Sequence, residues 1–225
     1  MEEIKQLLGE KAAEMIPNHV TVGIGSGTTS ECFIKSLAKK CSEGLSIKAV
    51  ASSEKSFKLA KKLNIPIFEP NGKILDYYVD GADQVDSLKQ MIKGKGGALL
   101  REKILATNSI KRIIMIDYSK YVKNLGNIIL PVEVSTFCAS YVKDKIKGMN
   151  YSSDFRFYEN SKLYLTDNGN NIIDMKIEKI IDDPRGFHQK IKAIPGVVET
   201  GIFINLADVI ILGKQDQKIN FIFLT

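Results

Sequence analysis

Three aspartates recur at intervals of three residues in the stretch VDGADQVD, at Asp80, Asp83 and Asp86, directly after a run rich in apolar residues. Carboxylates in such a cluster can exchange protons with a substrate, hold Mg²⁺, or cap turns that follow a strand. Gly81 and Ala82 stand between the first two acids, which does not match the calcium-loop pattern. We therefore expect no metal here, and two hypotheses remain, namely proton transfer and turn capping.

A second pattern, GIGSGTTS, joins a predicted strand to a predicted helix through a glycine-rich turn. Free backbone N–H groups and the positive end of the helix dipole favour an anion at such a turn, where Gly27 allows close approach. Ser26, Thr28 and Thr29 add hydroxyl donors. The dinucleotide fingerprint would need a glycine at position 28, and the lysine of a P-loop is absent. The turn thus favours a phosphate monoester over NAD or ATP, the alternative being a glycine turn that only opens a helix.

The third pattern is MIKGKGGALLREKILA, a glycine-rich loop at residues 93–97 followed by a strongly helix-forming segment. Glu102 falls in the first turns of that predicted helix, where a carboxylate can simply complement the helix dipole. An ionised glutamate is also a ready base at neutral pH, and removing a carbon-bound proton benefits from a raised pKa. Taken alone, this motif does not decide between the two roles.

Seven motifs in the same order resemble one known family, type A ribose-5-phosphate isomerase, along nearly the whole chain. They are GIGSGTTS, VDGADQVD, MIKGKGGALLREKI, IDYSKYVKNLG, LPVEV, LTDNGNNIID and AIPGVVETGIF. The resemblance implies an aldose–ketose isomerase that interconverts ribose 5-phosphate and ribulose 5-phosphate through an enediol(ate), in the non-oxidative pentose phosphate pathway. Because that route moves hydrogen as a proton, we expect no cofactor and no metal.

The resemblance also implies residue roles. Glu102 corresponds to the base that moves a proton between C2 and C1, and Asp80 to the acid for ring opening. Asp83 would orient substrate hydroxyls, and Lys93 would stabilise negative charge on the enediolate. Lys120 and Lys5 are expected to be cationic partners of the phosphate. The full set of positions expected to bind substrate is Ser26, Gly27, Thr28, Thr29, Gly81, Ala82, Gly94, Lys95, Gly96, Lys120 and Lys5.

Three features depart from the usual pattern of the family. Gln84 stands where many members have glutamate, which removes one charge from the rim of the expected site. Lys95 interrupts a loop that is often unbroken glycine. The segment around Asn205 is one residue shorter than usual, which affects the expected geometry of that loop.

Other protein classes share the expected core. Aminosugar-phosphate deaminases and CoA transferases resemble it, and a noncatalytic sugar-phosphate sensor could keep the phosphate loop. A CoA transferase needs a covalent glutamate, for which Glu102 is the candidate, but the isomerase motifs around it argue against this. A sensor that controls transcription needs a DNA-binding module, and we expect none before residue 20 or after residue 213.

The order of predicted elements indicates an α/β fold with two parts. Up to about residue 125, β-rich runs alternate with helical stretches, which predicts a parallel, Rossmann-like sheet. The following segment has the order β-α-β-β-α-β of a ferredoxin-like α+β unit, with a hairpin predicted at Asn168-Gly169 and a helix start at Asp183-Pro184. The tail is expected to return to the first sheet. The predicted domains are 1–126 plus 205–225, and 127–204.

The composition of the chain argues against several kinds of binding partner. The 225-residue chain is 44% hydrophobic and 26% charged, with no run long enough to span a bilayer and no signal-peptide pattern, so we expect a cytoplasmic protein without a membrane partner. The net charge of +6 comes mostly from scattered lysines, which argues against nucleic acid. Three cysteines without metal spacing and two distant histidines suggest no further site. The family resemblance implies a homodimer or homotetramer.

Overall fold

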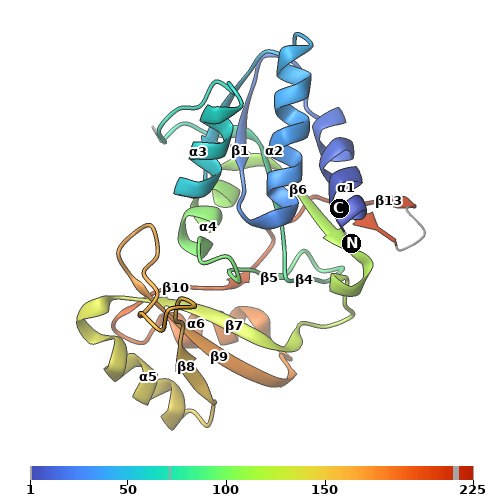
Figure 1. Ribbon diagram of the computed structural model, residues 1–225. Coiled ribbons are helices and arrows are strands. Elements are labelled where there is room, and N and C mark those ends of the chain that lie inside the picture. Colours follow the sequence, from blue (N-terminus) through green and yellow to red (C-terminus); the bar gives the residue numbers. More distant parts are fainter. Residues whose placement is uncertain (1, 71, 215–217, 225) are drawn as a thin grey trace.

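A six-stranded sheet forms the centre of the larger part of the molecule (Figure 1). The computed structural model describes residues 2–70, 72–214 and 218–224. The strand order is β13-β12-β6-β3-β1-β2, and every neighbouring pair is parallel except β12 with β13. The strands are β1 (Val20–Ile24), β2 (Ile47–Ala51), β3 (Leu75–Gly81), β6 (Ser109–Asp117), β12 (Val209–Gly213) and β13 (Ile219–Phe223).

Helices pack on both faces of this sheet because its central strands are apolar on both sides. One face carries α1 (Glu2–Glu14), α2 (Gly27–Ser42) and α3 (Glu54–Lys62), which share one hydrophobic core with the sheet. The other face is covered by α4 (Leu99–Thr107) and by a small three-stranded sheet. That small sheet has the order β11-β5-β4 and consists of β4 (Gln84–Val85), β5 (Met91–Ile92) and β11 (Ile202–Phe203).

The order of the large sheet creates a place for a ligand. The chain passes from β1 outward to β2 and then returns to form β3 on the opposite side of β1. The connections that follow β1 and β3 therefore diverge, and they leave a crevice at the carboxyl ends of these two strands. Ligands of open α/β sheets bind at this switch point. The glycine-rich turn of GIGSGTTS, here called the phosphate-loop motif, follows β1, and the aspartates of VDGADQVD lie at and after the end of β3. Both predicted motifs therefore meet at this crevice.

The smaller part of the chain has the predicted β-α-β-β-α-β order, and its sheet is antiparallel with the order β10-β7-β9-β8. This is the strand order of a ferredoxin-like unit, which confirms the fold class. One face packs on two helices through a core that includes Leu130, Val132 and Ile173. The elements are β7 (Gly126–Val134), α5 (Ala139–Gly148), β8 (Ser153–Phe155), β9 (Asn171–Ile180), α6 (Pro184–Lys192) and β10 (Val197–Thr200).

Most expected elements are present, but the first arm of the predicted hairpin at Asn168-Gly169 is wrong. Residues 161–167 form only an isolated bridge, Leu163 to Phe157, and no strand. The reason is that β9 already pairs with β7 along one edge and with β8 along the other. The return of the tail to the first sheet is confirmed by β12 and β13. The division into two domains at residues 126 and 205 stays a prediction.

Two short 3₁₀ helices complete the chain, at Tyr118–Lys120 and Thr136–Cys138. Within the described ranges, no helix is both long and apolar enough to cross a membrane.

Candidate active site

A cavity of about 450 Å³ opens at the carboxyl ends of β1, β3 and β6. Its wall includes every predicted site residue except Asp80, and it adds Asp117, which the sequence did not single out. Five separate segments of the chain supply this wall. The lining residues are Lys5, Ser26, Gly27, Thr28, Thr29, Gly81, Ala82, Asp83, Lys93, Gly94, Lys95, Gly96, Glu102, Asp117 and Lys120.

Asp80 lies behind the cavity wall, completely buried at 0% exposure. Its Oδ1 accepts hydrogen bonds from the Ser26 and Gly81 backbone N–H groups, at 3.1 and 2.8 Å, and from the Ser30 hydroxyl at 2.7 Å. Its Oδ2 accepts from the Tyr78 hydroxyl at 2.5 Å and from Lys93 Nζ at 2.7 Å. One carboxylate thus ties together the two loops that follow β1 and β3.

This geometry bears on the role expected for Asp80. An acid that opens a sugar ring must reach the substrate. Asp80 does not line the cavity, and donors from the protein surround both of its oxygens. The contacts of Asp80 thus position Lys93 and the Ser26 loop, and the direct proton transfer expected from the resemblance stays a prediction.

Gly25 shows how tightly Asp80 is enclosed. A Cβ atom on Gly25 would lie 1.9 Å from Cγ of Asp80, a distance that no side chain tolerates. The backbone N–H of Gly25 also donates to the carbonyl of Val79 at 2.9 Å, which holds the two strand ends together. Glycine at this position therefore permits the close packing of the two loops.

Lys93 and Glu102 form the charged centre of the site, each only 3% exposed. Lys93 Nζ lies 3.1 Å from Glu102 Oε2 and donates to the carbonyl of Gly81 at 2.5 Å. Burial raises the pKa of Glu102 to about 7, an effect that the Lys93 ammonium opposes and the Asp80 charge reinforces. Burial alone would lower the pKa of Lys93, but the carboxylates of Asp80 and Glu102 raise it above its ordinary value. Lys93 is therefore a permanent cation, whereas Glu102 titrates near neutral pH.

Ser26 links the phosphate-loop motif to Glu102. It is the N-cap residue of α2, yet its side chain makes no capping hydrogen bond. Its hydroxyl donates to Glu102 Oε1 at 2.5 Å. The structure thus gives the Ser26 side chain a carboxylate as its partner, while Gly27, Thr28 and Thr29 at the start of α2 line the cavity.

The end of the cavity beside α2 is basic. Lys5 from α1 donates to the Thr28 hydroxyl at 2.9 Å. Lys120 lies 3.7 Å from Asp117, whose carboxylate also accepts from the Ser119 backbone N–H at 3.1 Å. Two lysines and the positive end of a helix therefore face the same space, which is suited to a phosphate group.

The three aspartates of the opening motif have three different surroundings. Asp83 lines the cavity, and its Oδ2 accepts from the Lys95 backbone N–H at 3.1 Å. Asp86 is buried and accepts from the backbone N–H groups of Leu88 and Gln90, so it caps a turn. The turn-capping hypothesis thus holds for Asp86, whereas proton transfer by this motif stays a prediction.

Gln84 explains one departure from the family pattern. Its amide nitrogen donates to the carbonyl of Gly126 at 2.8 Å, and its amide oxygen accepts from the N–H of the same residue at 3.0 Å. A glutamate could not donate the first of these bonds. Gln84 thus fastens the site loop to the start of β7.

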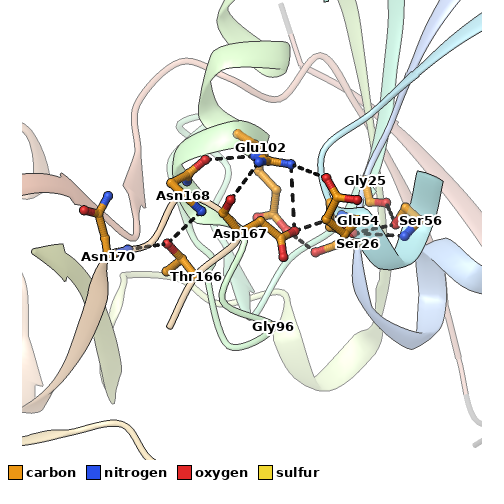
Figure 2. A network of polar contacts seen from close by, with 12 residues as sticks. Gly25, Ser26, Glu54, Ser56, Gly96, Glu102, Thr166, Asp167, Asn168 and Asn170 are labelled. Atoms are coloured by element: carbon orange, nitrogen blue, oxygen red, sulfur yellow. Dashed lines mark hydrogen bonds and ion pairs between the residues drawn. The ribbon is translucent and has the colours of Figure 1, made fainter. Parts of the chain in front are cut away.

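The smaller unit reaches the site through the loop 166–170 (Figure 2). Arg101, the neighbour of Glu102 on α4, donates to the Asn168 side chain at 2.8 Å and to the Asp167 carbonyl at 2.9 Å. The Asp167 carboxylate accepts from the backbone N–H of Glu54, at the start of α3, at 2.8 Å. Figure 2 shows these contacts of the loop together with the bond between Ser26 and Glu102.

A buried glutamate holds that loop in place. Glu133 is 0% exposed, and its Oε1 accepts from Thr166 Oγ1 at 2.9 Å, from Asn168 Nδ2 at 3.1 Å and from Asn170 Nδ2 at 2.9 Å. The start of α3, which this loop contacts at Glu54, is in turn bonded to the loop after β1, because the hydroxyl of Ser56 donates to the carbonyl of Gly25 at 2.7 Å. The smaller unit therefore contacts the start of α3, which holds Gly25. It also contacts α4 at Arg101, the residue before Glu102.

Sequence reasoning missed Tyr78, Asp117, Glu133 and Arg156, all of which contact the site or the residues that hold it. Tyr78 could have been found, because it stands two residues before Asp80 on a strand and so shares its face. Glu133 and Arg156 belong to the other unit, and no local pattern connects them to the site. In the ranges that the structure describes, no group of three or more His, Cys, Asp or Glu side chains is arranged to hold a metal.

Comparison with known proteins points to one family. The family described as ribose 5-phosphate isomerase A (phosphoriboisomerase A) matches residues 48–217. The ribose-5-phosphate isomerase A of Protochlamydia amoebophila (strain UWE25) is 42% identical over 213 residues, which cover 94% of this chain and 92% of that protein.

Solved structures agree over the whole chain. Ribose 5 phosphate isomerase A from Neisseria gonorrhoeae superimposes with a TM-score of 0.91 at 39% identity, covering 100% of this chain and 97% of that one. A D-ribose-5-phosphate isomerase in complex with phospho-erythronic acid gives a TM-score of 0.93 at 33% identity, covering 99% of this chain and 98% of that one.

Proposed function

Because this chain belongs to the ribose 5-phosphate isomerase A family, we propose that it interconverts D-ribose 5-phosphate and D-ribulose 5-phosphate through an enediol(ate), with Glu102 as the base. One observation carries the role of Glu102. Its buried carboxylate lines the cavity, has a pKa raised to about 7, and lies 3.1 Å from the permanent cation Lys93. A base poised near neutral pH beside a fixed positive charge suits proton removal next to a carbonyl.

The substrate lies with its phosphate at the start of α2. There the helix N–H groups, Thr28, Lys5 and Lys120 bind the anion. The reacting carbons then extend toward Glu102 and Lys93. Phospho-erythronic acid, the ligand of the similar structure, combines a phosphate with a carboxylate, and this cavity offers cations for both.

The proton transfer at carbon and the stabilisation of charge are assigned to residues of the cavity. The carboxylate of Glu102 takes the proton from C2 of the open-chain aldose, which leaves an enediolate, and returns it to C1, while the hydroxyl proton on O2 passes to O1. The negative charge that develops on the oxygens is stabilised by Lys93 and by backbone N–H groups of the loop at residues 94–96. Asp83, fixed by the Lys95 N–H, accepts hydrogen bonds from substrate hydroxyls. Asp80 keeps Lys93 in place from behind.

The proposed substrate is tested by an assay of the purified protein with ribose 5-phosphate and with ribose. We expect ribulose 5-phosphate to form with kcat/KM at least about a hundredfold above that for ribose, because the phosphate supplies remote binding energy. Thr28→Val should raise KM for ribose 5-phosphate about fivefold to tenfold and change kcat less. Equal use of ribose and ribose 5-phosphate would contradict a phosphate site at α2.

The raised pKa of Glu102 predicts the pH dependence. The base works as a carboxylate, so kcat/KM should be half its maximum near pH 7, level off at higher pH, and fall about tenfold per unit at pH values well below 7. Steady-state rates between pH 5 and pH 9, at substrate concentrations far below KM, measure this limb. A profile that stays flat down to about pH 5 would mean that the essential base has an ordinary carboxyl pKa and is not Glu102 in these surroundings.

Four further proposals rest on the sequence and its resemblance to the family. The enzyme serves the non-oxidative pentose phosphate pathway, acts in the cytoplasm, needs no cofactor, and assembles as a homodimer or homotetramer. The domain division at residues 126 and 205 belongs with them, supported by the two separate sheets.

A further inference from the structure

The glycine loop of the site is held from outside the cavity by an arginine of the smaller unit. Arg156 Nη1 donates to the carbonyl of Gly94 at 2.9 Å and to the carbonyl of Lys95 at 3.0 Å. Arg156 is not part of the 450 Å³ cavity wall, whereas both residues that it contacts are. It lines a neighbouring cavity of about 420 Å³ that shares Asp83, Lys95 and Lys120 with the site cavity, so it reaches the loop from beside the site.

The guanidinium is itself fixed. Arg156 Nε donates to Asp174 Oδ2 at 2.9 Å, and Nη2 donates to the other oxygen of the same carboxylate. The two side chains are 14% and 26% exposed, so this bidentate pair is well shielded from solvent. The ring of Tyr164 lies beside the guanidinium carbon, 5.8 Å from its centroid. A planar fork held at both edges restricts where the loop carbonyls can lie.

Fixing a carbonyl also fixes an N–H group. The peptide unit is planar and trans, so the N–H that follows a carbonyl points the opposite way. The Gly94 carbonyl faces Arg156, and the following N–H, that of Lys95, donates to the carboxylate of Asp83 at 3.1 Å. The Lys95 carbonyl likewise faces Arg156, which turns the N–H of Gly96 away from it.

We propose that Arg156 is a positioning residue for catalysis, which sets the directions of the Lys95 and Gly96 N–H groups and, through the first of these, the carboxylate of Asp83. The inference rests on the proposed isomerase function. Arg156 is not among the residues that line the site cavity, and its effect reaches the reaction through the peptide planes of the loop. A displacement of about 1 Å in such a loop is enough to lower the rate about a hundredfold.

The test compares Arg156→Ala, Arg156→Lys and Asp174→Asn with wild type, and uses Arg185→Ala as a control of equal charge change. Arg185 is exposed on α6 and lies outside the residues placed in the site. Each protein is assayed for kcat and KM with ribose 5-phosphate, for inhibition by inorganic phosphate, and for thermal unfolding.

We expect Arg156→Ala to lower kcat about tenfold to a hundredfold while KM and phosphate inhibition change less than about threefold. Arg156→Lys should recover part of the loss, because an ammonium can still donate to one carbonyl. Asp174→Asn should lower kcat by a smaller factor, and Arg185→Ala should match wild type. If Arg156→Ala does not fold, the two conservative variants decide the question.

Unchanged kcat in folded Arg156→Ala, or unchanged kcat in both conservative variants, would overturn the positioning role and leave the isomerase function intact. A loss of activity that follows the unfolded fraction alone would overturn it too. A wild-type protein without isomerase activity would overturn the proposed function, and this inference with it.

Discussion

Replacing Glu102 with glutamine should reduce kcat at least about a thousandfold and leave the affinity for ribose 5-phosphate nearly unchanged. The amide has the size of the carboxylate, and its oxygen can still accept from the Ser26 hydroxyl. It cannot take up a proton from carbon, however, so the step that needs a base is lost. Steady-state kinetics, together with direct binding of the substrate to the variant, separate the two effects.

Glu159→Gln is the matched control, since Glu159 is exposed in the loop after β8 and far along the chain from the cavity residues. It should retain wild-type kcat and KM. An active Glu102→Gln protein would remove Glu102 from the role of base. A variant that folds but no longer binds the sugar phosphate would show that Glu102 serves binding instead.

Replacing Lys93 with methionine should damage both activity and stability. Lys93 pairs with the buried carboxylates of Asp80 and Glu102, and methionine leaves both without a counter-charge. Breaking a buried pair in this way costs about 3 kcal/mol of unfolding free energy. We expect kcat to fall about a hundredfold to a thousandfold through lost stabilisation of the enediolate. Urea unfolding and kinetics on the folded protein measure the two losses separately.

Removing Lys93 should also change how the activity depends on pH. The Lys93 ammonium lowers the pKa of Glu102, so its removal should move the acidic limb of the activity profile to higher pH. Lys58→Met, at an exposed position of α3, removes the same charge outside the site. It should change neither the stability nor the activity of the protein. A Lys93→Met protein as stable and as active as this control would contradict a charged centre built on Lys93.

The fold could be predicted from sequence where the pattern is local and regular. The apolar runs at β1, β2, β3 and β6 alternate with helix-forming stretches, and this order fixes a parallel sheet. The small strands β4 and β5 were not predicted, because two residues are too few to carry a period, and the single strand predicted at residues 196–204 is divided into β10 and β11. The absent arm at residues 161–167 depended on which edges of β9 were free, and only the pairing of distant strands decides that.

The site was predictable in its parts and less so in its connections. Glu102, Lys93 and the loop that contains Thr28 all line one cavity, as expected from motifs that follow strand ends. The sequence did not indicate that Asp80 would be buried behind Lys93, because exposure depends on how two loops pack at Gly25. Nor could it reveal Arg156, which is 62 residues from the carbonyl of Gly94 that it holds.

The central claim, that Glu102 moves hydrogen as a proton, is tested most directly by running the isomerisation in D₂O. Wild-type enzyme and ribose 5-phosphate are kept together for many turnovers, and the deuterium at C1 of the ketose and C2 of the aldose is measured by NMR. The proposed mechanism predicts that deuterium accumulates at both carbons with wild type and at neither with Glu102→Gln. Complete retention of protium after many wild-type turnovers would contradict it, since hydrogen would then pass between the carbons without ever becoming an exchangeable proton.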